Sequence, residues 1–199
     1  AKVTIEHGFV EAEATNLRGA RVYLDFPSAG ATQHIMTAAC LAEGTTYIEN
    51  AALEPEVVEL ARYLVAMGGR VYGAGTSTIQ VEGVQRLHGI TYDMIPDRME
   101  VGTFALAGAI TRGDVTLAGA IPDHCIPLLQ KLQETGVKVV TGNDYIRVIC
   151  GRQPVATDIK TMPHPGFPTD MQQPFAALLS IADGTSVISE NVYEGGSST

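Results

Sequence analysis

The sequence lacks any run of about 18 apolar residues, the length that a helix needs to cross a bilayer. Basic residues are also scarce, because 13 Lys and Arg stand against 22 Asp and Glu, which gives a formal net charge of −9. A nucleic-acid backbone is normally bound by a basic surface. We therefore expect neither a membrane nor a nucleic acid among the partners of this chain.

Cysteine is rare and follows no recognisable spacing. The residues Cys40, Cys125 and Cys150 form neither a CxxC pair nor a zinc-ligand pattern, and an odd number is typical of a reducing compartment. The first residues, AKVTIEHGFV, lack the basic and apolar regions of a signal peptide. We therefore expect a cytoplasmic protein with unreactive, packed thiols. Cys125 is a possible exception, since a helix start there would favour its thiolate.

What the sequence does contain is a repeat. Each copy predicts a strand, a turn, an Ala-rich helix, an acidic or Gly turn, and another strand, with a period of about 70 residues. The copies begin at Leu17, Leu87 and Pro154. Gly30 and Gly102 occupy matching predicted helix starts, and Thr169-Asp170 takes the same place in the third copy.

The first two copies continue with a second helix and a hairpin. Residues 54–69 and 122–136 have apolar residues at helical spacing and end in Gly, and a strand–turn–strand pattern follows each. One unit is therefore βαβαββ, and the fold class is α/β with helices covering one sheet face. Residues 1–16 resemble the closing hairpin of a missing unit, and the third copy stops after its second strand. We expect an incomplete set of units.

No complete catalytic set is visible, since the sequence has no Walker loop, H-E-x-x-H, G-x-G-x-x-G or G-x-S-x-G motif. We expect no metal and no cofactor. The segment DFPSAGAT stands out, because Ser28 is a good N-cap, and Ala29 and Gly30 let a ligand approach the backbone. Such a helix start binds diphosphates. From the pattern alone, a plain capped helix start is the simpler explanation.

The segment HPGFPTDMQQPF contains a second candidate. Three prolines stiffen the approach to Asp170, which lies at or near a predicted helix start. Asp170 is either an N-cap or a positioned carboxylate that acts as a general base. Two weaker candidates have simpler explanations as well: Glu54 opens a helix, where carboxylates suit the helix dipole, and Arg98 forms a surface pair with Asp97.

Four consecutive motifs carry a family resemblance. They are DFPSAGAT (25–32), LAEGTTYIENAALEPEVV (41–58), PDRMEVGTF (96–104) and PHPGFPTDMQ (163–172). In order and spacing they resemble the UDP-N-acetylglucosamine 1-carboxyvinyltransferases over nearly the whole chain, to about Glu194. The sister family that makes 5-enolpyruvylshikimate 3-phosphate shares the fold but differs in the last motif.

The resemblance implies the enolpyruvyl transferase fold, an inside-out α/β barrel of two lobes with three βαβαββ units each. The implied divisions are a closing hairpin (1–16), the last unit of one lobe (17–92), the first unit of the other (93–153), a partial second unit (154–194) and a flexible tail (195–199). The family's mobile loop and most residues that bind phosphoenolpyruvate would precede residue 1, so we expect the isolated chain to be inactive.

The resemblance also implies a reaction, the transfer of enolpyruvyl from phosphoenolpyruvate to the 3-hydroxyl of UDP-N-acetylglucosamine. This is the first committed step of peptidoglycan synthesis, on which cell-wall biogenesis, cell shape and cell division depend. Asp170 matches the carboxylate proposed to deprotonate the hydroxyl. The residues that match UDP-N-acetylglucosamine contacts are Ser28, Ala29, Gly30, Asp170 and Val192. Glu54 and Arg98 match positions near the lobe boundary and have a supporting role.

Two alternatives to this function remain open at the level of sequence. The chain could belong to a non-catalytic binding or scaffold protein with the same fold, in which Asp170 only caps a helix. It could instead belong to an enzyme of the 5-enolpyruvylshikimate 3-phosphate synthase type. A complementary chain could also supply the missing units.

Overall fold

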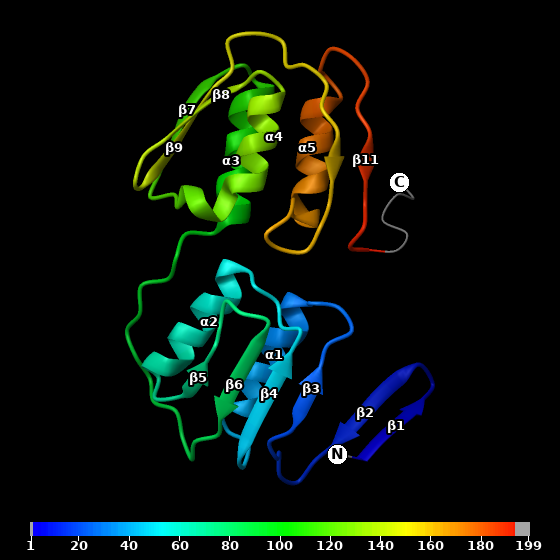
Figure 1. Ribbon diagram of the computed structural model, residues 1–199, viewed down its shortest axis with the longest axis vertical. Coiled ribbons are helices and arrows are strands. Elements are labelled where there is room, and N and C mark those ends of the chain that lie inside the picture. The colour runs from blue at the N-terminus through cyan, green and yellow to red at the C-terminus, as the bar shows by residue number, and fades with distance from the viewer. Residues whose placement is uncertain (1, 194–199) are drawn as a thin grey trace. The chain divides into compact units, whose positions relative to one another are not determined.

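The computed structural model describes residues 2–193 and contains two compact units, Ala1–Met94 and Ile95–Thr199 (Figure 1). Each unit is described by itself below. Among the described residues, no helix combines the length and the apolar character that crossing a bilayer requires.

The first unit begins with an antiparallel hairpin of strands β1 (Lys2–Glu6) and β2 (Phe9–Glu13). The turn residues His7 and Gly8 both have positive φ, at 53° and 82°. Positive φ at both central residues is the mark of a type I′ turn, whose twist matches that of the two strands. Almost every residue of the hairpin is exposed, including the apolar ones.

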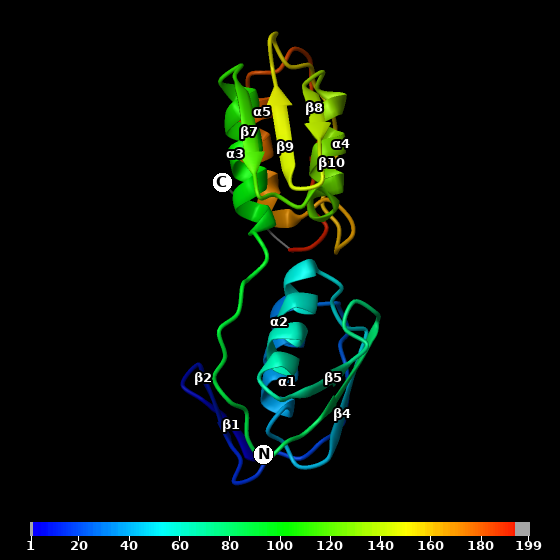
Figure 2. The ribbon, with the colours of Figure 1, turned by 90° about the vertical axis from the view of Figure 1, so that its left-hand side faces the viewer.

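The remainder of the first unit is a four-stranded sheet with two helices. Its elements are β3 (Arg21–Tyr23), α1 (Ala29–Ala39), β4 (Thr45–Glu49), α2 (Pro55–Ala66), β5 (Arg70–Tyr72) and β6 (Thr78–Glu82). The strand order is β3-β4-β6-β5, and only β3 and β4 are parallel. Both helices lie on one face of the sheet (Figure 2), where Met36, Ile48 and Ile79 form the centre of the core. The predicted βαβαββ order is confirmed in this unit.

The second unit has two short sheets. Its elements are α3 (Arg98–Ile110), β7 (Asp114–Ala118), η1 (Pro122–Cys125), α4 (Ile126–Glu134), β8 (Lys138–Thr141), β9 (Tyr145–Ile149), β10 (Ile159–Lys160), η2 (Thr169–Met171), α5 (Gln172–Leu179) and β11 (Ile188–Ser189). Strands β7-β9-β8 form an antiparallel sheet, and β10 and β11 a parallel pair. The helices lie between the two sheets (Figure 1), so in this unit sheets flank a helical interior.

The core of the second unit joins all three of its helices. Phe175 of α5 is fully buried and meets the ring of Phe167 edge-on, with centroids 5.5 Å apart. Leu132 of α4 and Ile146 of β9 are also fully buried in the same cluster. Aromatic pairs in this geometry add to the free energy gained by burial.

One predicted strand is wrong. The pattern indicated a strand at the start of the second copy, after Leu87, but residues 83–97 contain none. The part of this segment that belongs to the first unit packs on α2 instead. The Tyr92 ring lies edge-on to Tyr63 of α2 at 5.3 Å, and its hydroxyl hydrogen-bonds the Glu59 carboxylate. The N–H groups of Val84 and His88 donate to the carbonyls of Cys40 and Met67, which lie outside any strand.

The match between Gly30 and Gly102 is also wrong in detail. Gly30 is the second residue of α1, whereas α3 begins at Arg98 and places Gly102 in its second turn. A Cβ at Gly102 would lie 2.7 Å from side-chain atoms of both Leu128 and Met171. Gly102 therefore serves close packing between helices, not the start of one.

Candidate functional site

Two of the predicted segments meet at one edge of the sheet in the first unit. Strands β3 and β4 are parallel, so the loops that follow them leave from the same edge. The Asn50 side chain donates to the carbonyl of Leu24 at 2.7 Å, and the Ala52 N–H donates to the Thr32 hydroxyl at 3.1 Å. The start of α1 is thereby bound to the loop that leads to α2. Ligands in α/β folds commonly bind at the carboxyl ends of parallel strands.

Ser28 is the N-cap of α1, as predicted. Its hydroxyl accepts a hydrogen bond from the Ala31 N–H at 3.2 Å, and its carbonyl accepts from the Thr32 hydroxyl at 2.8 Å. The first N–H groups of a helix have no partner within the helix. A cap bond to Ala31 leaves the N–H groups of Ala29 and Gly30 without an intrahelical acceptor.

The surface above Gly30 is open. A Cβ at this position would meet no atom within 4 Å, and the residue is exposed. Packing therefore does not require glycine here, in contrast to Gly102. An open, capped helix start is a suitable place for an anionic group, because the helix dipole and N–H groups both favour negative charge.

Glu54 occupies the N-cap position of α2 but makes no side-chain cap hydrogen bond. Pro55 follows as the first helical residue, and Glu56 is the acidic residue of the first turn. The prediction that this segment opens a helix is confirmed. Glu54 is half-buried.

Asp170 is not a helix cap. It lies in the middle of η2, and neither Pro168 before this turn nor Met171 before α5 offers a capping side chain. The Asp170 carboxylate is exposed and makes no hydrogen bond or ion pair with residues 2–193. The interpretation of Asp170 as an N-cap is therefore wrong. Its carboxylate is available to an external group.

The turn that carries Asp170 is fixed by a carboxylate that the sequence did not single out. Glu190 accepts hydrogen bonds from the hydroxyls of Thr161 at 2.8 Å and Thr169 at 2.9 Å. It also accepts from the N–H groups of Val192 at 2.7 Å and Tyr193 at 3.1 Å. Glu190 therefore anchors both the turn that carries Asp170 and the backbone of Val192, which are two predicted substrate contacts.

Hydrogen bonding keeps Glu190 ionised. Burial by itself would raise the pKa of this carboxyl, but the four donated hydrogen bonds outweigh burial and hold the pKa below its usual value. A lowered pKa means that the charged form stabilises the fold. This contribution is present above the ordinary carboxyl pKa of 4.5 and is lost as the pH falls through the lower folded value.

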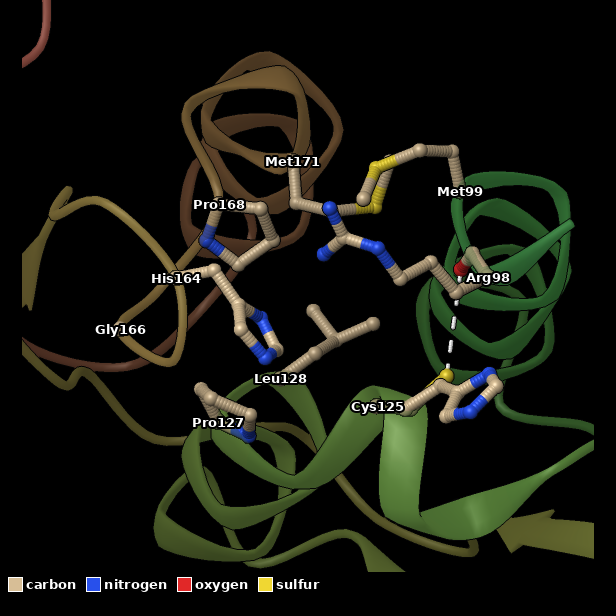
Figure 3. Close-up of a pocket in the computed structure, with 10 residues that line it drawn as sticks. Arg98, Met99, Cys125, Pro127, Leu128, His164, Gly166, Pro168 and Met171 are labelled. Atoms are coloured by element: carbon tan, nitrogen blue, oxygen red, sulfur yellow. Dashed lines mark hydrogen bonds between the residues drawn. The ribbon is translucent and has the colours of Figure 1, made fainter. Parts of the chain in front are cut away.

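Arg98 lies beside the same region of the second unit. Its guanidinium lines a small pocket together with His164, Gly166 and Pro168, from the segment that precedes Asp170 (Figure 3). The opposite wall consists of residues from η1 and α4. Asp97, its predicted surface partner, instead caps α3 by accepting from the N–H groups of Met99 and Glu100.

The second unit therefore brings Asp170, Val192 and Arg98 into one region, and the first unit brings Ser28, Ala29 and Gly30 close to the Glu54 loop. Within residues 2–193, no three His, Cys, Asp or Glu side chains form a group that could hold a metal ion.

Residues 1–195 match the EPSP synthase (3-phosphoshikimate 1-carboxyvinyltransferase) family. The chain belongs to this family of enolpyruvyl transferases. It is 53% identical to proteins named UDP-N-acetylglucosamine 1-carboxyvinyltransferase from Trichormus variabilis and from a Nostoc species, over 98% of its own length. It spans 44% of the length of these relatives. The resemblance seen in the sequence motifs is confirmed.

Solved structures confirm the fold. The enolpyruvyl transferase NikO from Streptomyces tendae superposes with a TM-score of 0.82 over 97% of this chain and 49% of that one, at 24% identity. An EPSP synthase from Acinetobacter baumannii gives a TM-score of 0.60 over 87% of this chain and 40% of that one, also at 24% identity. At this identity the likeness concerns the fold alone.

In this enolpyruvyl transferase chain, Cys125 is not an activated thiol. It ends the short turn η1 and lies buried before α4, where its Sγ is 3.9 Å from the Arg98 carbonyl (Figure 3). Burial raises the pKa of the Cys125 thiol to about 11, although the nearby Arg98 charge acts in the opposite direction. The expectation of packed thiols is confirmed, and the exception considered for Cys125 is wrong, because desolvation outweighs the Arg98 charge that would favour a thiolate. All three cysteines are buried and free.

The raised pKa predicts slow alkylation. With its pKa near 11 instead of 9.0, Cys125 has about 100-fold less thiolate at pH 8, and burial slows access further. We expect iodoacetamide to modify Cys125 at least about 100-fold more slowly in the native chain than in the same chain unfolded in guanidinium. Mass spectrometry of tryptic peptides gives both rates. Equal rates would contradict the buried, protonated thiol.

Proposed function

We propose that this chain forms part of a UDP-N-acetylglucosamine enolpyruvyl transferase. The enolpyruvyl group passes from phosphoenolpyruvate to the 3-hydroxyl of the sugar, and phosphate is released, which is the first committed step of peptidoglycan synthesis in the cytoplasm. The observation that carries this proposal is the 53% identity, over 98% of the chain, to proteins of that name. The available carboxylate of Asp170 supports it independently.

Asp170 acts as the general base in this proposal. An ionised carboxylate is a far weaker base than an alkoxide, so it cannot remove the hydroxyl proton in advance. It takes the proton while the hydroxyl oxygen forms its bond to carbon 2 of phosphoenolpyruvate, whose double bond is protonated at carbon 3. Loss of a proton from carbon 3 then expels phosphate and restores the double bond in the product. A carboxylate without a partner among residues 2–193 is ready to accept that proton, whereas a capping carboxylate would already be occupied.

The start of α1 binds the diphosphate of the nucleotide sugar. Ala29 and Gly30 offer backbone N–H groups, and the Ser28 hydroxyl, which accepts from Ala31, still has its own proton to donate. This explains how a chain with a net charge of −9 binds an anionic ligand. Val192 contacts the sugar through its backbone. Glu54 supports the start of α1 within the first unit, and Arg98 supports the Asp170 region within the second.

We further propose that the 199-residue chain alone does not turn over. It corresponds to 44% of the length of its relatives, and two substrates must be oriented by groups from the whole protein. A complementary chain that supplies the other segments would then restore the reaction.

A chimera tests the function. Residues 1–195 replace the matching segment of the Trichormus variabilis relative, and phosphate release is followed with phosphoenolpyruvate and either UDP-N-acetylglucosamine or shikimate 3-phosphate. We expect turnover with the nucleotide sugar only. Turnover with shikimate 3-phosphate would assign the chain to the other branch of the family. A folded chimera that binds UDP-N-acetylglucosamine without turnover would favour a non-catalytic role.

A further inference from the structure

Glu190 connects three segments that are separate in sequence. Its carboxylate oxygen Oε2 accepts the bond from Thr169 in η2, while Oε1 accepts from Thr161, just after β10, and from the N–H groups of Val192 and Tyr193. Glu190 itself follows β11 directly. A carboxylate has only acceptor sites, and all four bonds here are donated to it.

Thr161 makes this connection rigid. Its side chain is fully buried, and its hydroxyl accepts from the Asn191 N–H at 2.9 Å while donating to Glu190. The Asn191 amide also donates to the Thr161 carbonyl at 3.2 Å. The segment 190–193 is therefore bound to the end of β10 by side-chain and backbone contacts. Hydrogen-bond networks of this kind fix the positions of their members.

We propose that Glu190 is a positioning residue for the transfer reaction, holding the Asp170 turn and the Val192 backbone at a fixed separation. This inference rests on the proposed function. In this proposal Glu190 acts through its neighbours: its Oε2 bond to Thr169 positions the base, and its Oε1 bonds position the 192–193 backbone that meets the sugar. The two oxygens therefore control two different steps, proton transfer and sugar binding.

Separate substitutions test the two halves in the chimera. Thr169→Val has nearly the shape of threonine but removes only the Oε2 bond, so we expect kcat to fall about 10-fold with the KM for UDP-N-acetylglucosamine within about 2-fold. Glu190→Ala removes both anchors, and we expect a lower kcat together with a KM raised about 10-fold. Glu190→Gln keeps an acceptor oxygen for the backbone donors, and should restore KM more fully than kcat.

Thr157→Val is the matched control. The Thr157 hydroxyl donates to the Glu134 carboxylate at 2.6 Å, which is the same kind of bond in the same unit but away from Asp170. It should leave kcat and KM unchanged. Equal losses from Thr169→Val and Thr157→Val, or unchanged kcat in Thr169→Val, would overturn the positioning role while leaving the proposed function intact. A chimera inactive before any substitution would overturn the proposed function as well.

Backbone amide shifts of the 199-residue chain provide a readout that does not depend on activity. In nitrogen–proton spectra, Thr169→Val should shift the amides of η2 and leave that of Val192 in place, whereas Glu190→Ala should shift both. Unchanged Asp170 and Val192 signals in Glu190→Ala would show that the carboxylate does not hold these segments, and would overturn the inference.

Discussion

Replacing Asp170 with asparagine should reduce the turnover of the chimera by at least about 100-fold, because general-base groups typically contribute 100- to 10,000-fold to rate. Asparagine has nearly the same shape but cannot accept the hydroxyl proton. The exposed Asp170 side chain makes no bond to residues 2–193 that the change would break, so the fold should be unaffected. Initial rates of phosphate release give kcat, and calorimetry gives the affinity for UDP-N-acetylglucosamine.

The control for this substitution is Asp144→Asn. Asp144 is an exposed acid in the turn between β8 and β9 of the same unit, and has no assigned role. The Asp144→Asn variant loses the same negative charge as Asp170→Asn and should retain full activity. Undiminished turnover in Asp170→Asn would remove the general-base assignment, and equal losses in both variants would reduce it to a general effect of charge.

Phe175→Ala should destabilise the second unit by about 3–5 kcal/mol, the usual cost of truncating a fully buried phenylalanine. The Phe175 side chain has no exposed surface. Its truncation removes its contacts within the core cluster and the edge-on pairing with Phe167. Urea unfolding followed by circular dichroism measures the change. Because the core clusters of the two units are separate, the transition of the first unit should stay in place.

Phe104→Ala is the matched control, since Phe104 lies in α3 of the same unit and is 55% exposed. We expect its unfolding midpoint to move little. Comparable losses from the two phenylalanines would show that Phe175 does not lie at the centre of this core. A shift of both transitions with Phe175→Ala would show that the two units unfold together.

Local sequence chemistry predicted several features correctly, for physical reasons. The Ser28 cap and the helix that opens after Glu54 depend on neighbouring residues alone, so a short stretch of sequence determines them. The βαβαββ order of the first unit follows from hydrophobic spacing and turn residues in the same way. The family resemblance then pointed to Asp170 and Val192, beyond what spacing alone indicates.

Features that depend on contacts between residues distant in the sequence could not be predicted from the sequence. A strand after Leu87 was plausible locally, but Tyr92 contacts α2 instead. Gly102 looked like a helix start, yet its small size serves contacts with Leu128 and Met171. The anchoring role of Glu190 could hardly be predicted, because the only local indication was a threonine at each end of the 161–169 segment. Its four hydrogen bonds form only when three segments come together.

The β1–β2 hairpin has a consequence for the time scales of motion in this chain. It is a two-stranded ribbon without a third strand among residues 2–193, and such ribbons are only marginally stable in water. Its amides are protected by few buried contacts, whereas those of β4 and β6 lie over a closed core. Hydrogen exchange in deuterated water should therefore be much faster in the hairpin than in the four-stranded sheet of the same unit, so that this unit contains both fast and slow amides.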